Sequence, residues 1–284
     1  NENTMSGPTL IGPFGDSPTT NFQALTILNG KVAVGVPGQT NTVGARMCVG
    51  YYSTTAPGAE TAGELEINGG AFICNSTVSV GRNNGNATTA PGGLTSRITI
   101  NGGAVTFSLL ALGYNGISGF NNFNARPACD VNAGTLTVSS YCNVAETVGA
   151  TAALNVNGGF VRVNGRHSVD TPAGILLGGP ASAGNGTLNI GGTGAVYCAH
   201  NVALCTANNA TGTLNLNGGM LSANNIVRHT NGIATLRFNG GTFQPLTHGL
   251  TLTNLTAAYV STNGALIETS LANGYTIAQN LLHE

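Results

Sequence analysis

Acidic side chains, which could serve general acid–base catalysis, are few and scattered along this sequence. Asp and Glu together number ten in 284 residues, and the one close set is Glu60, Glu64 and Glu66. Glu64 and Glu66 stand two positions apart, so they point to the same side of an extended strand. Enzymes that cleave polysaccharides need carboxylates gathered on one face. Because the other acids are scattered, we expect this pair on a solvated outer face and not in an active site.

Histidine could add metal-binding chemistry at one place in the sequence. His167 and His200 each stand two residues before a valine in neighbouring repeats, so they could lie one above the other in a stacked fold. A zinc site needs three or four protein ligands. No third histidine or carboxylate recurs at the same position of the repeat. We therefore expect no metal site and no cofactor.

The cysteines form an even set without any Cys-x-x-Cys spacing, which disfavours a zinc site and fits disulfides in an oxidising compartment. The six are Cys48, Cys74, Cys129, Cys142, Cys198 and Cys205. Six cysteines allow fifteen connectivities. Local pairing around corners and loops favours Cys198 with Cys205, Cys129 with Cys142, and then Cys48 with Cys74. Unpaired thiols buried in a core remain the alternative.

These acids, histidines and cysteines stand in a chain that is built from a repeated sequence motif. An apolar, a polar, an apolar and a polar residue are usually followed by a glycine pair, as in residues 65–70 and 214–219. Eight copies begin at Leu25, Leu65, Ile98, Leu136, Leu154, Leu188, Leu214 and Leu236. The two shortest intervals, from 136 to 154 and from 214 to 236, are 18 and 22 residues long. A second, weaker alternating segment follows each glycine pair, so each repeat supplies two or three short strands.

Period-two alternation places the aliphatic residues on one side of each strand, and helical spacing of apolar residues is absent. Asn-Gly favours tight turns, and here it recurs at the same position of the repeat, so it turns a corner in coil after coil. Strands this short bury their apolar side only when coils are stacked. The sequence therefore predicts an all-β, single-chain parallel β-solenoid of about eight coils. A β-propeller or a β-sandwich fits the short intervals poorly.

The Leu-x-Ile-x-Gly-Gly units of residues 21–245 resemble the strand repeats in the passenger regions of bacterial autotransporters and of related secreted parallel β-helix surface proteins. The resemblance implies a right-handed coil and a place outside the cell. Repeats of this kind are scaffolds that carry adhesins, structural fibres and occasional enzymes. The resemblance therefore bears on the fold and leaves the function open.

Composition narrows the function further. Charged residues make up only 7% of the chain, the formal net charge is −1, and 43 residues are glycine. Nucleic-acid binding rests on clustered Lys and Arg, so we expect no nucleic-acid partner. No apolar run reaches about 18 residues, so we expect no membrane span. A start at Asn1 instead of Met fits a processed, exported protein, although a trimmed chain would look the same. We expect a secreted protein, extracellular or on the cell surface.

The two ends lack the glycine-pair motif. Residues 1–20 contain three prolines, which indicates an extended N-terminal cap, or an arm that docks on a neighbouring subunit. The apolar residues of that possible assembly arm are Met5, Leu10, Ile11 and Phe14. We interpret residues 246–284 as a C-terminal cap or assembly segment. The possible interface residues there are Tyr259, Leu281 and Leu282.

Solenoid ends expose unpaired strand edges, which natural proteins usually protect with charge or proline. The last forty residues contain only Glu268 and Glu284 as acids and no Lys or Arg. A front edge that meets a back edge propagates as a filament. We therefore expect a non-enzymatic structural subunit of an extracellular fibre or surface assembly, polymerising head to tail with copies of itself.

Two other functions remain open at this stage. One is a surface adhesin or glycan-binding module, whose partners would be cell-surface glycans. Its sugar-binding strip would be made of exposed tyrosines, namely Tyr51, Tyr52, Tyr114, Tyr141 and Tyr197. The other, less favoured because acids are so few, is a polysaccharide-active enzyme.

Overall fold

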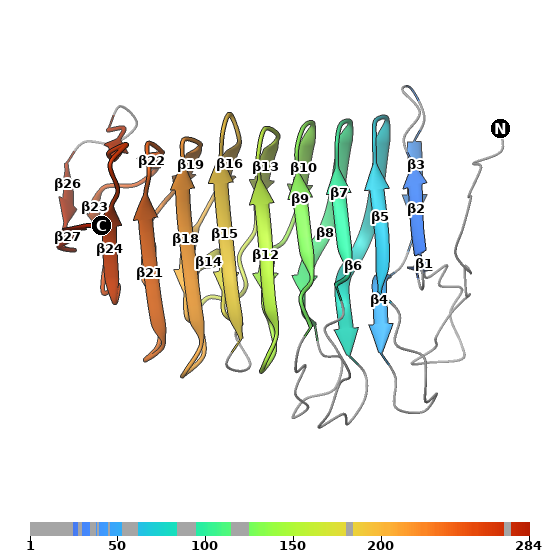
Figure 1. Cartoon of the computed structure of the whole chain (residues 1–284), viewed down its shortest axis with the longest axis horizontal. Helices are drawn as coiled ribbons and strands as arrows, with labels where there is room; N and C mark the ends of the chain where they lie inside the picture. Colours follow the sequence, from blue (N-terminus) through green and yellow to red (C-terminus); the bar gives the residue numbers. More distant parts are fainter. Residues whose placement is uncertain are drawn as a thin grey trace.

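The computed structural model describes residues 25–27, 30–34, 38, 40–44, 46–52, 62–83, 95–114, 125–179, 184–269 and 274–284. Within these residues, 27 short strands stack along one long axis in chain order (Figure 1). Every pairing between named strands is parallel. The chain is thus an all-β parallel solenoid, which confirms the fold class expected from the sequence. In the described part of the chain, no helix is long and apolar enough to cross a membrane.

Each complete coil contributes strands to three faces, which we call face 1, face 2 and face 3. Face 1 is a ten-stranded sheet. Its strands, in order, are β2 (Gly30–Val34), β5 (Gly63–Ile67), β7 (Arg97–Ile100), β9 (Ala128–Val131), β12 (Thr151–Val156), β15 (Asn185–Gly191), β18 (Thr211–Asn217), β21 (Ile233–Phe238), β24 (Ala257–Val260) and β27 (Leu281–His283).

Faces 2 and 3 belong to one sheet because two long strands, β6 (Ala71–Asn83) and β8 (Ala104–Leu112), run through both. Face 2 also contains β3 (Thr40–Val43), β10 (Thr135–Val138), β13 (Phe160–Val163), β16 (Ala195–Cys198), β19 (Met220–Ala223), β22 (Thr242–Pro245) and β25 (Leu266–Ile267). Face 3 also contains β1 (Leu25–Ile27), β4 (Met47–Tyr52), β11 (Cys142–Val144), β14 (Ala173–Leu177), β17 (Asn201–Leu204) and β20 (Ile226–Arg228). Near the C-terminal end, β23 (Gly249–Thr251) and β26 (Tyr275–Ile277) form a separate two-stranded sheet.

Strand register aligns the apolar residues of successive coils into rows that face the interior. The central row of face 1 consists of Val32, Leu65, Ile98, Cys129, Leu154, Leu188, Leu214, Leu236, Ala258 and Leu281. The first nine are buried, whereas Leu281 in the last coil is 42% exposed. Full burial of one Leu or Ile side chain contributes about 1.5–3 kcal/mol, so each coil is stabilised mainly by the coils on either side of it.

The glycine at the corner between face 1 and face 2 is required by both conformation and space. Gly103 has φ +82°, and a Cβ there would lie 2.4 Å from the carbonyl oxygen of Gly70 in the preceding coil. Gly134, one coil further, has φ +75° and stands in the same relation to Gly103. The glycine pairs of the motif therefore stack on one another and let the coils approach to strand-pairing distance.

Two of the eight predicted copies occupy a different face from the other six. The copies at 65, 98, 154, 188, 214 and 236 lie on face 1. The copy at Leu25 forms β1 on face 3, and the copy at Leu136 forms β10 on face 2. These two copies alternate in sequence like the other six, so the motif alone does not show which face a copy forms. In the coil that contains Leu136, β9 takes the face 1 position, and Asn132-Ala133-Gly134 replaces the expected Asn-Gly-Gly after it.

Parallel pairing continues beyond residue 245, where the repeat region was expected to end. β24 pairs with β21, and β27 pairs with β24. Face 1 therefore carries ten stacked strands where the sequence motif indicates about eight coils. The motif misses these two because Ala257–Val260 and Leu281–His283 lack the glycine pair that marks the corner.

The stacked corner predicts different costs for two glycine substitutions. Gly264 has φ +79°, and a Cβ added there would have no atom within 4 Å, so Gly264→Ala should cost only the left-handed backbone penalty, about 1 kcal/mol. Gly103→Ala carries the same penalty and must also displace the Gly70 backbone, which adds about 1–3 kcal/mol. Urea unfolding of the two variants measures the difference. Equal losses in the two variants would contradict close stacking at the corner.

Candidate functional site

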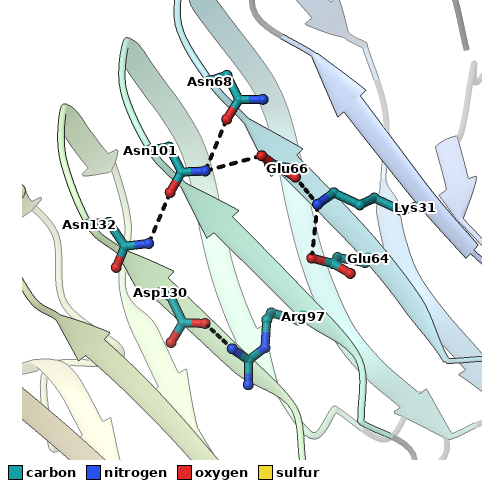
Figure 2. A network of polar contacts seen from close by, with 8 residues as sticks. All are labelled: Lys31, Glu64, Glu66, Asn68, Arg97, Asn101, Asp130 and Asn132. Carbon is teal, nitrogen blue, oxygen red and sulfur yellow. Dashed lines mark hydrogen bonds and ion pairs between the residues drawn. The ribbon is translucent and has the colours of Figure 1, made fainter.

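A network of charged side chains lies on the outer surface of face 1, over β2, β5, β7 and β9 (Figure 2). The Lys31 ammonium nitrogen is 3.6 Å from a Glu64 carboxylate oxygen and also contacts Glu66 directly. Two strands further, an Arg97 guanidinium nitrogen lies 2.8 Å from a carboxylate oxygen of Asp130. Glu64 and Glu66 thus occupy a partly solvated outer face, as expected, and each is paired with a cation. Glu60 lies outside the described residues.

Asparagine side chains link successive coils in two ladders beside these ion pairs. In each step, the amide nitrogen of one coil donates to the side-chain oxygen of the coil before it, over 2.6–2.9 Å. The corner ladder comprises Asn68, Asn101, Asn132 and Asn157. The mid-strand ladder comprises Asp130, Asn155, Asn189 and Asn215. Asn101 also donates to Glu66, which joins the corner ladder to the ion pairs (Figure 2).

These ladders were not anticipated from the sequence, although its repeats contain the signal for them. The fourth position of the motif is Asn in most copies and supplies the corner ladder, but we interpreted it only as a turn residue. The mid-strand ladder comes from the second position, which is Asn at 155, 189 and 215. Once the strands stack in register, each of these positions becomes a column of amides, and each amide can both donate and accept. Exposed ion pairs contribute only about 0–1 kcal/mol each. The network links equivalent positions of successive coils. Its carboxylates already contact cations and amide groups.

A second group of polar side chains, the Glu146 cluster, lies on the outer side of face 3 and consists of Tyr141, Asn143, Glu146 and His167. Asn143 is 1% exposed, and it lies in the row between Ala111 and Leu176 of the adjacent strands. The Tyr141 and His167 rings meet edge to face with centroids 4.9 Å apart. The segment after β13 brings His167 back over β11, so the cluster joins residues from two coils.

Three buried polar atoms in the Glu146 cluster lack hydrogen-bond partners among the described residues: Asn143 Oδ1, Glu146 Oε2 and His167 Nδ1. Burial raises the pKa of Glu146 from 4.5 to about 7, and a hydrogen bond from Asn143 only partly opposes this. Burial also lowers the pKa of His167 and, with Glu146 nearby, raises the pKa of Tyr141. Glu146 can therefore give or take a proton near neutral pH. The sequence does not reveal this, because Glu146 is an isolated acid.

Among the described residues, no group of three or more His, Cys, Asp or Glu side chains is placed to hold a metal ion. His167 contacts Tyr141, as described above. His229 lies in another coil, where its Nε2 is 3.3 Å from the hydroxyl of Thr171. The five tyrosines considered for a sugar-binding strip do not share one face: Tyr141 immediately precedes β11 on face 3, whereas Tyr197 is on β16 of face 2.

The disulfides proposed from the cysteine count are not formed. All six cysteines lie within the described residues and are buried, and none is disulfide-bonded. The Cys198 thiol points toward the carbonyl oxygen of Asn201, at 3.5 Å, and the Cys205 thiol toward that of Ile233, at 2.6 Å. Burial raises the pKa of both thiols to about 11. Cys129 and Cys142 belong to the core cluster, so cysteine serves here as a small apolar residue.

The residues proposed from the sequence for a C-terminal interface, Tyr259, Leu281 and Leu282, lie in the last two strands of face 1. Leu281 and Leu282 are 42% and 46% exposed, and Arg237 stacks over the Tyr259 ring at 5.4 Å. Four of the seven strongly exposed large apolar side chains among the described residues lie in this last part of the chain: Leu266, Ile277, Leu281 and Leu282. The expected arm residues Met5, Leu10, Ile11 and Phe14 lie outside the described residues.

The raised pKa of Glu146 predicts that this group weakens the fold as pH rises. The folded protein keeps a proton that the unfolded chain releases near pH 4.5, so stability falls between about pH 4.5 and 7 and is constant above. The loss is on the order of 3 kcal/mol. Glu146→Gln, which mimics the protonated acid, should abolish this loss in urea unfolding. Asp170→Asn, at an exposed acid, is the control; a Glu146→Gln protein with the wild-type pH dependence would contradict the assignment.

Buried thiols predict slow chemical modification of the native protein. The raised pKa of each cysteine leaves little thiolate near pH 8, and burial blocks the reagent. A thiol-reactive dye should therefore label the folded chain slowly and label six thiols rapidly after urea unfolding without a reductant. Fewer than six reactive thiols in the unfolded, unreduced chain would restore the disulfide hypothesis.

Comparison with known proteins identifies no relative of this chain. No family model matches it, and neither a curated protein nor a solved structure matches it. The fold therefore rests on the strand pairing itself, namely two large all-parallel sheets wound as a β-solenoid.

Proposed function

We propose that this protein is a structural subunit of an extracellular fibre or surface assembly, in which solenoids stack head to tail. The observation that carries the proposal is the C-terminal coil. Leu281 continues the central inner row of face 1, yet it is 42% exposed, while the nine residues before it in the row are buried. An apolar position at the end of a core row is stabilised when another coil covers it.

The backbone at this end is also open to a further strand. Among the described strands, β25 pairs only with β22 and β27 pairs only with β24. Such an edge presents unpaired N–H and C=O groups to another chain. At the opposite end of face 1, β2 pairs only with β5 among the described strands. A second copy could therefore place its β2 against β27 and continue the parallel ladder.

Electrostatic repulsion between two stacked copies should be weak. Glu284 beside the C-terminal edge is paired with Arg237, at 2.9 Å between nitrogen and oxygen, and accepts a hydrogen bond from Ser261. The formal net charge of the chain is only −1, so copies repel one another weakly. The repeat motif resembles that of secreted surface proteins, which supports an extracellular location. A structural role also fits the acid pair Glu64 and Glu66, since Lys31 pairs with both.

Electron microscopy of the 284-residue chain at increasing concentration tests head-to-tail stacking. Ten face 1 strands at about 4.8 Å each predict filaments with an axial repeat of about 5 nm. Leu281→Lys places a charge at the end of the core row and should leave single particles with an unchanged β-rich circular dichroism spectrum. Ile233→Lys is the matched control, since Ile233 is 56% exposed but begins a strand inside the stack.

Two results would refute head-to-tail stacking. One is wild-type protein that remains monomeric at all concentrations. The other is a Leu281→Lys protein that forms filaments as readily as the Ile233→Lys control.

A further inference from the structure

The outer surface of face 2 carries one charged side chain in an otherwise uncharged sheet. From β3 to β22, the outward positions are Thr40, Thr42, Ala71, Ile73, Ala104, Thr106, Thr135, Thr137, Phe160, Arg162, Ala195, Tyr197, Met220, Ser222, Thr242 and Gln244. Arg162 is the one ionised residue among them. It forms no ion pair with any described residue, whereas Lys31, Arg97 and Arg237 on face 1 each pair with a carboxylate.

Two aromatic rings hold Arg162 in place. Its guanidinium carbon lies 5.4 Å from the ring centroid of Phe160, two residues earlier on β13. The same carbon lies 4.7 Å from the ring centroid of Tyr197, the cross-strand neighbour on β16. A cation within about 6 Å of a ring is attracted to the ring face. The charge is thus fixed on a rigid sheet, where its N–H groups need no reorganisation to meet an anion.

The side chains around Arg162 and its two aromatic rings suit a ligand rich in hydroxyl groups. Thr137 stands beside Arg162 on one side, and Ser222 and Gln244 continue the row beyond Tyr197. In the neighbouring row, small Ala195 lies between Phe160 and Met220, so aromatic and apolar surface adjoins the charge. Aromatic and apolar side chains with a few placed polar groups are the usual lining of ligand sites in proteins. No acid occupies these outward positions from β3 to β22; the row first reaches an acid at Glu268, just after β25 and four strands from Arg162.

We propose that Phe160, Arg162 and Tyr197 form a binding site for a negatively charged polysaccharide, whose carboxylate or sulfate group pairs with Arg162. The guanidinium can donate two parallel N–H bonds to either group. The rings of Phe160 and Tyr197 offer apolar surface to the sugar, and the Thr137 hydroxyl can bond its hydroxyls. Ser222 is buried and donates to the side-chain oxygen of Gln244 at 2.7 Å, which leaves the Gln244 amide N–H groups to bond the sugar. The site lies on the side of the solenoid, away from β27, so it does not depend on head-to-tail stacking.

Binding of defined polymers to the 284-residue chain tests this site. Polygalacturonate presents carboxylates, dextran sulfate presents sulfates, and dextran is the neutral control. At about 20 mM salt, where screening is weak, wild-type protein should bind at least one charged polymer and not dextran. The bound polymer identifies the anionic group. Arg162→Gln should weaken binding about tenfold or more, as loss of a charge-assisted hydrogen bond predicts.

Matched variants separate this site from general charge effects. Arg126→Gln removes the same charge from an exposed arginine just before β9 and should change binding less than about twofold. Tyr197→Ala keeps the charge but removes the closer ring, and it should weaken binding several-fold. Circular dichroism checks that each variant is folded.

Four results would overturn the proposal. Wild-type protein that binds neither charged polymer would do so, as would equal losses in Arg162→Gln and Arg126→Gln. Dextran bound as tightly as the charged polymers would remove the role of charge. Poly-glutamate bound as tightly as polygalacturonate would replace the polysaccharide by an acidic peptide.

Discussion

The rest of the structure depends on stacking of identical positions in successive coils. On face 1, parallel pairing in register places Leu65 under Ile98 and Leu188 under Leu214, so each side chain of the central row is buried by its equivalents in the neighbouring coils. The same register aligns the corner glycines, where a methyl group would meet the backbone of the preceding coil. It also aligns the outer asparagines into ladders. The buried inner rows, the stacked corner glycines and the outer asparagine ladders thus all result from the stacking of equivalent positions.

Each coil of such a repeat offers the same kind of stacking surface as the coil before it. Every residue of the central inner row of face 1 from Val32 to Ala258 is buried, whereas Leu281 is 42% exposed. The exposed Leu266, Ile277 and Leu282 lie at the same end. Among the described residues, most of the strongly exposed large apolar side chains therefore gather at the C-terminal edge, where the inner row is not covered. Assembly by stacking would extend the existing contacts without requiring a new kind of interface.

The fold could be predicted from sequence because alternation and the Asn-Gly-Gly corner are both visible in short segments. Short strands joined by such corners bury their apolar side only when the coils stack. The faces on which Leu25 and Leu136 lie could not be predicted, since these two copies show the same alternation in sequence as the copies on face 1. Cysteine parity suggested disulfides, but Cys129 and Cys142 pack as apolar side chains in the core cluster beside Leu, Ile and Val. Contacts between coils, such as Arg162 on Tyr197 or His167 on Tyr141, depend on register and loop path, which no local pattern encodes.

Hydrogen exchange at the C-terminal edge tests stacking most directly. In dilute protein, backbone amides of Leu281–His283 that lack a partner should exchange rapidly, while those of the interior strand Thr211–Asn217 remain protected. In concentrated protein, stacking of a second copy predicts that the edge amides become protected as well. Rapid exchange at this edge at every concentration, with the interior strand still protected, would contradict the account.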